Sequence, residues 1–166
     1  MRGVAEVKVM WVNSPHRPTA HKASRELLKK IVDFGRRHQI VIVNDNPYSF
    51  ILNDNPLSIL QVEGAKDICI EFNSMSKTHS MAGWRQGICC GKKEFIQWIT
   101  RVKSNVDSGM FRPVMKAAVA ALNNPKEFFV EQNNAYRERR IAAEEIMKHL
   151  GCEFDPAQSG LFLWGR

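Results

Sequence analysis

The sequence contains no apolar run long enough to cross a membrane, and its first residues do not have the layout of a signal peptide. Low-complexity tracts and internal repeats are also absent from its 166 residues. Hydrophobic residues make up 44% of the chain and charged residues 25%, which is the ordinary balance of a soluble globular protein. We therefore expect a soluble domain with its own core and no membrane partner.

Cysteine is scarce, and no pair among the cysteines has the spacing of a zinc site. Nothing in the sequence indicates secretion, so we expect reduced, buried thiols in a cytoplasmic protein and no bound metal. Two of the cysteines are adjacent and should point to opposite faces of a strand. The cysteines are Cys69, Cys89, Cys90 and Cys152.

No basic block interleaved with aromatic residues is present, although the net charge is +7 and the isoelectric point is near 9.4. The lysines and arginines are scattered, alternate with acids and fall on the expected polar faces of helices. No nucleic-acid-binding motif accompanies them. Solvated helix faces explain the charge, and we expect no nucleic-acid partner.

The order of apolar runs and turn signals predicts an α/β fold. A strand, a helix, two further strands that are each followed by a loop, and a fourth strand fit part of an open, mostly parallel sheet with flanking helices. Ser24 is expected to cap the first helix, whose inward side chains are Leu27, Leu28, Ile31, Val32 and either Phe34 or Gly35. Strands are expected over residues 7–12, 40–43, 67–72, 87–91 and 161–164, and further helices over 92–106, 113–122 and 124–150.

Lys77 carries the strongest chemical signal in the sequence. It lies among small hydroxyl residues directly after the apolar run 68–72, and Arg85 follows it eight positions later. An amine so placed at the end of a strand can form an imine with an aldehyde cofactor, and the hydroxyls and the arginine can take a phosphate.

Four stretches resemble, in the same order, the motifs of one family. The lysine stretch 74–87 reads Ser-x-Ser-Lys-Thr-x-x-x-x-Gly-Trp-Arg-x-Gly and closely resembles that of the fold-type I, pyridoxal-phosphate-dependent aminotransferases of class I/II. Residues 15–20 are similar to that family's Pro-x-Asn-Pro-Thr-Gly loop, 45–48 to its Asp-x-x-Tyr, and 160–164 to its Gly-Gly-x-Phe-x-Trp.

The resemblance implies roles for three of these residues. Lys77 would hold pyridoxal 5′-phosphate as an internal aldimine and then act as general base and acid. Asp45 would pair with the pyridine nitrogen of the cofactor, and Tyr48 would donate a hydrogen bond to its 3′-oxygen. From the residues alone, Lys77 could instead be a surface lysine, Asp45 an Asx-turn residue and Tyr48 a packing tyrosine.

The resemblance also implies a phosphate-binding group of residues. Two positions of this sequence depart from the family pattern. Arg85, Ser74 and Ser76 would bind the phosphate, although local capping is an alternative for the two serines. Arg17 stands where the family has an asparagine that contacts the cofactor and substrate, and it could reach an acidic substrate or crowd the ring. Ala20 replaces a glycine of the family.

By this resemblance, residues 1–122 are part of a cofactor-binding large domain, and 123–166 are a long connecting helix and the beginning of a small domain. We expect an internal piece of a longer aminotransferase that transfers an amino group between an amino acid and a 2-oxo acid by a ping-pong route. The full-length protein would be a homodimer and the isolated piece inactive. A lyase of the same fold and a folded, non-catalytic fragment remain alternatives.

Overall fold

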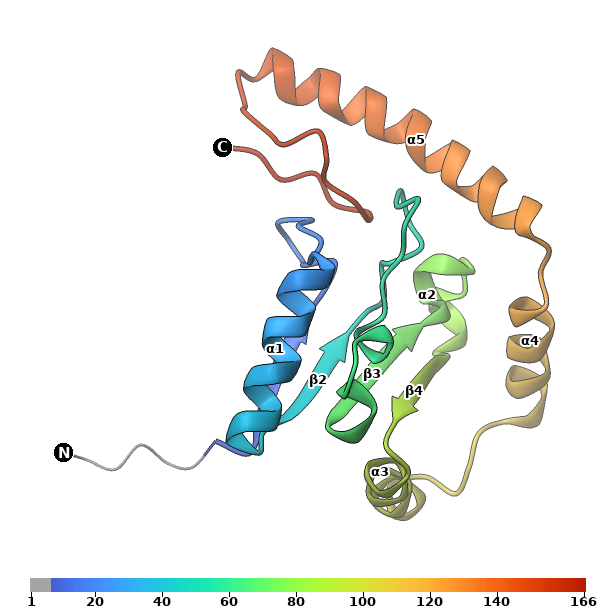
Figure 1. The fold of residues 1–166 in the computed structure, drawn as a ribbon. Helices are drawn as coiled ribbons and strands as arrows, with labels where there is room; N and C mark the ends of the chain where they lie inside the picture. Colours follow the sequence, from blue (N-terminus) through green and yellow to red (C-terminus); the bar gives the residue numbers. More distant parts are fainter. Residues whose placement is uncertain (1–6) are drawn as a thin grey trace.

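The computed structural model describes residues 7–166, and its centre is one mixed four-stranded sheet (Figure 1). The spatial order is β1-β2-β3-β4, with the first three strands parallel and β4 antiparallel to β3. The open, mostly parallel sheet with flanking helices is therefore confirmed, with a reversed strand at one edge. The strands are β1 (Val9–Asn13), β2 (Val41–Asp45), β3 (Cys69–Ser74) and β4 (Gly87–Gly91).

Helix α1 (Arg25–His38) crosses one face of the sheet (Figure 1). Ser24 caps it as predicted, because its hydroxyl accepts a hydrogen bond from the Leu27 N–H at 3.1 Å. Leu28, Val32 and Gly35 are buried against the sheet. The expectation that Leu27 and the alternative Phe34 face inward is wrong, since their side chains are 42% and 44% exposed.

The core between α1 and the sheet also receives the short helices η1 (Ile59–Gln61) and η2 (Ala65–Asp67). Glu71 is buried there with its carboxylate satisfied by the Asn44 side chain at 2.8 Å and the Ile59 N–H at 2.9 Å. The hydrogen bonds of this buried side chain join β2, β3 and η1, as is usual for a buried polar group.

The cysteines are all free thiols, and their burial differs from the prediction. Cys69 is buried, and burial followed by the nearby Glu71 carboxylate raises its pKa to about 12. Cys90 is exposed, so the expectation of uniformly buried thiols is wrong at that position. Alternating burial of Cys89 and Cys90 follows from the pleat of β4.

The remaining helices lie at the edge and end of the sheet. After α2 comes the short helix η3 (Ala82–Trp84), and α5 passes over the end of the sheet at which β2 and β3 finish (Figure 1). Gly151, with φ +72°, follows the end of α5 as predicted. The helices are α2 (Met75–Thr78), α3 (Lys93–Val106), α4 (Arg112–Leu122) and α5 (Lys126–His149).

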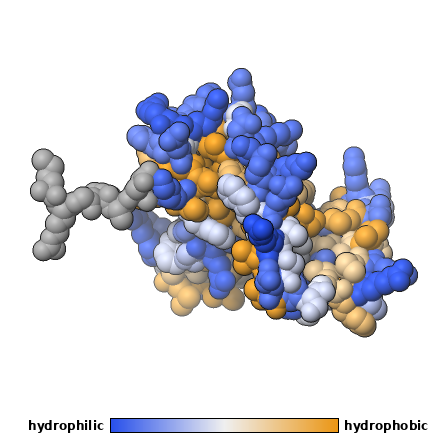
Figure 2. All heavy atoms as spheres, turned by 90° about the horizontal axis from the view of Figure 1, so that it is seen from below, coloured by the Kyte–Doolittle hydropathy of each residue, from blue (hydrophilic) through white to orange (hydrophobic). Residues whose placement is uncertain are grey.

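Helices α3 and α5 contain no buried residue in the described part of the chain, and α4 buries only Ala118. Several large apolar side chains on these helices are exposed, among them Trp98, Val106 and Val119. Figure 2, which views the molecule from the α3 end, shows hydrophobic atoms open at the surface between hydrophilic ones. Within residues 7–166, no helix has the length and apolarity needed to cross a membrane.

The strand predicted over residues 161–164 is wrong. Only an isolated antiparallel bridge joins Phe154 to Gly165, and the Trp164 backbone is hydrogen-bonded to the Gln158 side chain. This continuous apolar run has no neighbouring strand with which to form a ladder among the described residues.

Candidate active site

The loop between β3 and β4 carries Lys77. Ser74 ends β3 and caps α2, because its hydroxyl accepts a hydrogen bond from the Ser76 N–H at 3.2 Å. Thr78 donates back to the Ser74 carbonyl at 2.8 Å, which closes this single helical turn. Lys77 is half-buried, and within residues 7–166 its amine makes no hydrogen bond or ion pair. The lysine amine is thus free to react.

The antiparallel pairing of β3 with β4 brings Arg85 back to the start of the lysine loop. Ser74 pairs with Gly87, and the Met75 N–H donates to the Gln86 carbonyl at 3.1 Å. Arg85 directly precedes Gln86 and Gly87, the residues whose backbone bonds close the loop. The pairing therefore keeps the backbone of Arg85 close to the N-terminal turn of α2.

The residues proposed for phosphate binding lie at the two ends of this loop, Ser74 and Ser76 at the start of α2 and Arg85 after η3. Arg85 is exposed and donates one hydrogen bond, to the Ala82 carbonyl at 2.9 Å, and no described carboxylate pairs with it. The Ser76 side chain makes no hydrogen bond within the described residues. Ser74 caps α2, which is the local role that was the alternative to phosphate binding. The exposed Arg85 guanidinium keeps N–H donors that an anion could use.

Asp45 lies at the matching end of the neighbouring strand. It pairs in register with Phe72, the strand residue five positions before Lys77. Two further bonds join these strand ends: the Asn46 N–H donates to the Phe72 carbonyl at 2.8 Å, and the Asn73 side chain donates to the Asn46 carbonyl at 2.9 Å. The loops that carry the acid and the amine are therefore fastened to each other.

The Asp45 carboxylate is half-buried and accepts no hydrogen bond from any described residue. It does not make the Asx-turn contact that was the structural alternative. Burial raises the pKa of this carboxyl group, because the charged form loses solvation without gaining a donor. A cationic partner, such as a protonated ring nitrogen, would reverse that shift.

Tyr48 is buried and packs edge-to-face against Phe162, with ring centroids 5.4 Å apart and an interplanar angle of 89°. Its hydroxyl has no hydrogen-bond partner among the described residues. Gly160 approaches closely: its φ is +83°, and a Cβ at that position would lie 3.3 Å from the Tyr48 Cβ. The tyrosine therefore packs through its ring while its hydroxyl stays available.

Arg17 is exposed on the loop after β1. Its backbone N–H donates to the Asn13 side chain at 2.8 Å, and that same side chain donates to the Asp45 carbonyl at 2.6 Å. Its guanidinium lies 5.0 Å from the centroid of the Phe162 ring. Ala20, at the end of this loop, has a φ of +54°, so alanine occupies a left-handed conformation that favours the family's glycine.

Helix α5 supports the site through side chains that the sequence analysis did not single out. Gln132 donates to the Lys77 carbonyl at 3.3 Å and to the Ser80 hydroxyl at 2.7 Å. Asn133 accepts a hydrogen bond from the Leu52 N–H at 2.7 Å. These contacts join residues more than fifty positions apart, and no local pattern in the sequence indicates them.

His79 joins the lysine loop to the start of α5. Its ring lies 5.3 Å from that of Phe129 in an edge-to-face arrangement and 6.4 Å from that of Phe128. Its Nδ1 is buried without a hydrogen-bond partner, and burial lowers its pKa. A neutral imidazole thus fills an apolar position two residues beyond Lys77.

The described groups fit an aldehyde cofactor with a ring nitrogen and a phosphate: a free amine, an unpaired acid on the adjacent strand, and an exposed guanidinium in the same loop as two hydroxyls. Comparison with known proteins decides the family. Residues 2–166 match the profile of the family described as aminotransferase class I and II.

The chain belongs to the aminotransferase class I and II family.

Relatives within this family are similar over nearly the whole chain. The sequence is 41% identical over 161 residues to the LL-diaminopimelate aminotransferase of Aquifex aeolicus (strain VF5), covering 96% of this chain and 42% of that protein. The chain therefore spans about two fifths of the length of the curated relatives that it matches.

Solved structures of other family members have the same fold. A probable N-succinyldiaminopimelate aminotransferase from Thermus thermophilus superposes with a TM-score of 0.89 at 32% identity, over 96% of this chain and 43% of that one. Aspartate aminotransferase from Thermus thermophilus, solved with maleate, gives a TM-score of 0.84 at 27% identity, over 92% and 41%.

Proposed function

We propose that the full-length protein containing this chain is a pyridoxal-phosphate-dependent aminotransferase that moves an amino group from an amino acid to a 2-oxo acid. The observation that carries the proposal is the unpaired Lys77 amine, held in one loop with Arg85 and fastened to the strand end that bears Asp45. When bound, pyridoxal 5′-phosphate supplies an aldehyde carbon and a ring that accepts electrons.

The residues of this chain would divide the work as follows. Lys77 would hold the cofactor through its aldehyde carbon, and its amine, when free of that carbon, would carry a proton to and from the substrate Cα as general base and acid. Asp45 would hold the proton of the ring nitrogen. Tyr48 would donate a hydrogen bond to the 3′-oxygen, and Ser74, Ser76 and Arg85 would hold the phosphate.

The substrate is proposed from the names of the relatives. LL-diaminopimelate aminotransferases are among the similar proteins. LL-diaminopimelate is therefore the first amino acid to assay, with 2-oxo acids as acceptors. Measuring both oxo acid formation and ammonia release separates amino transfer from elimination.

Cofactor loading tests the proposal directly. Adding pyridoxal 5′-phosphate to the full-length protein is expected to produce a visible absorbance band that borohydride reduction fixes to the polypeptide. Lys77→Ala should abolish both the band and the fixed cofactor, while Lys30→Ala, on an exposed turn of α1, should change neither. A band that survives Lys77→Ala would contradict the assignment.

Three broader features belong to the same proposal. We propose that the full-length protein is a homodimer, for which the exposed apolar side chains of α3, α4 and α5 give support. A large domain through residue 122 and a small domain beginning beyond α5 stay predictions, as does a cytoplasmic location. Light scattering of the full-length protein tests the dimer.

A further inference from the structure

Arg17 carries a guanidinium that has no ion-pair or hydrogen-bond partner in the described part of the chain. It is exposed, no carboxylate among residues 7–166 forms an ion pair with it, and none of those residues accepts a hydrogen bond from its guanidinium. Its one recorded side-chain contact is with the Phe162 ring, 5.0 Å away. All of its N–H donors are therefore available to an external acceptor.

The position of Arg17 is set from the backbone side by Asn13. The Asn13 oxygen accepts the Arg17 N–H, and its amide nitrogen donates to the Asp45 carbonyl. The Asn13 side chain thus joins the Arg17 loop to the end of β2, where Asp45 lies. The arginine belongs to the same edge of the sheet as Asp45 and Lys77.

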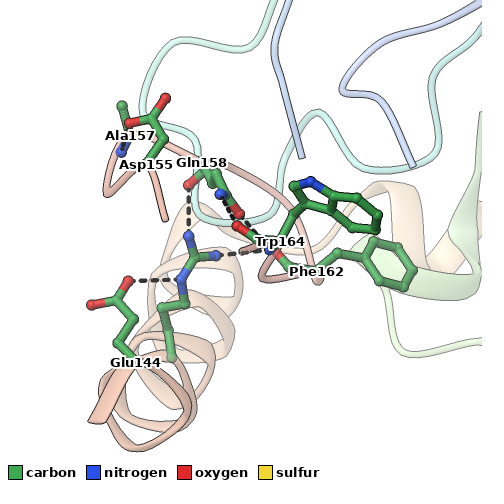
Figure 3. A network of polar contacts seen from close by, with 7 residues as sticks. Glu144, Asp155, Ala157, Gln158, Phe162 and Trp164 are labelled. Atoms are coloured by element: carbon green, nitrogen blue, oxygen red, sulfur yellow. Dashed lines mark hydrogen bonds and ion pairs between the residues drawn. The ribbon is translucent and has the colours of Figure 1, made fainter. Parts of the chain in front are cut away.

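Phe162 sets the position of the Arg17 guanidinium, which lies over its ring. The Phe162 ring packs on Tyr48, and its carbonyl accepts a hydrogen bond from Arg140 at 3.2 Å. Arg140 also pairs with Glu144 at 2.8 Å and donates to the Gln158 carbonyl at 3.4 Å. Figure 3 shows the Phe162 ring pointing away from this polar network.

Arg17 and Tyr48 therefore both contact the Phe162 ring, and the ring under the Arg17 guanidinium limits the motion of this long side chain before a ligand arrives. We infer that Arg17 is a specificity residue that binds the second carboxylate of a dicarboxylic amino acid. A guanidinium presents a planar fork of donors that matches a carboxylate in a bidentate manner. The inference rests on the proposed aminotransferase function and adds the substrate class.

The test uses the full-length, cofactor-loaded protein and a matched pair of probes, glutarate and pentanoate, which differ in one carboxylate. Affinities follow from the change that each probe causes in the cofactor absorbance, checked by calorimetry. Arg17→Gln is expected to weaken glutarate binding by roughly ten- to one-hundred-fold, the usual range for a lost charged hydrogen-bond pair. Pentanoate binding should stay nearly unchanged.

Two variants sharpen the result. Arg17→Lys keeps the charge but loses the fork, so its preference for glutarate should be intermediate. Arg139→Gln is the control: this exposed arginine also lies over an aromatic ring, that of Tyr136 at 5.7 Å, but on the α5 surface, and its loss should change neither affinity. Circular dichroism checks that each variant folds.

The outcomes separate the inference from the proposed function. If the cofactor band forms but Arg17→Gln alters both probes equally, or neither, the recognition of a second carboxylate is refuted while the aminotransferase proposal stands. If no Lys77-dependent band forms, the proposed function fails and the inference fails with it. Added salt should reduce the glutarate preference of the unmodified protein and leave that of Arg17→Gln unaffected.

Discussion

At the scale of single residues, the Asp45 carboxyl group is kept at a cost in stability. Burial raises the pKa of this carboxyl group in the folded protein above its pKa in the unfolded chain. The protonated carboxyl group therefore contributes stability below the unfolded pKa, and this contribution is lost as pH rises through the folded pKa. Asp45→Asn should therefore stabilise the cofactor-free protein at pH 7 and change it little at pH 3. Urea denaturation at the two pH values measures this.

The exposed residue Asp54 provides the control for that experiment. Asp54→Asn removes the same charge from a solvated position, so the free energy of unfolding should hardly change. Equal effects of the two substitutions would mean that net charge, rather than desolvation of Asp45, governs the result.

Gly160 is a second residue whose identity the backbone requires. Its positive φ and the nearness of the Tyr48 Cβ predict that Gly160→Ala destabilises the protein by about 1–2 kcal/mol. Gly83→Ala is the matched change, because no atom lies within 4 Å of the added Cβ. Thermal unfolding of both variants measures the difference, and similar melting temperatures would contradict the argument.

The placement of Lys77, Ser74 and Arg85 in one loop could be predicted from their spacing in the sequence, and their shared role in cofactor binding stays a prediction. The support that Phe162 gives to Arg17 could not be predicted, because it depends on a segment about 145 positions away folding back onto the first loop. Cys90 was misplaced because an apolar run does not distinguish a covered strand from an edge strand.

At the scale of secondary-structure elements, α5 stabilises two site loops through neighbouring side chains. Asn133→Ala leaves the Leu52 N–H without its acceptor and should cost about 1–3 kcal/mol. Asn134→Ala is the control, since Asn134 bonds only to the exposed Arg137 on the same helix in the described structure. Unfolding free energies, with hydrogen exchange at residues 48–53, report the effect.

His79 makes the contact between the lysine loop and α5 sensitive to pH. Burial lowers its pKa below the unfolded value near 6.5, so the unfolded chain takes up the proton first and stability falls as pH drops below that value. His79→Phe should remove this acid-side loss while keeping the packing on Phe128 and Phe129. Melting temperatures between pH 7.5 and pH 5 measure it, and an unchanged slope would refute the role of His79.

Elements with local signals were predicted well, and those that depend on distant partners were not. The Ser24 cap and the Gly151 stop lie within their own segments, so α1 and α5 were found close to their observed bounds. The apolar run 161–164 suggested a strand, but a strand also needs a neighbour. The periodic Leu27 and Phe34 face solvent because the described sheet covers only part of α1.

At the scale of the whole molecule, the exposed apolar side chains predict association of the 166-residue chain. Trp98, Val102 and Val106 recur at four-residue intervals on α3 and are 62%, 67% and 79% exposed. Sedimentation should show a mass that rises with concentration, and the double substitution Trp98→Lys with Val102→Glu should reduce it without changing net charge. A monodisperse monomer at high concentration would refute this.

The pairing of β3 with β4 should hold the two halves of the lysine loop in place even if the loop is cut. Ser74 pairs with Gly87, so everything between them is tethered to the sheet at both ends. A single proteolytic cut beside the exposed Ser80 would leave two stubs, each still anchored, with the lysine on one and Arg85 on the other. Such nicked material should migrate as one particle until denaturant separates its fragments.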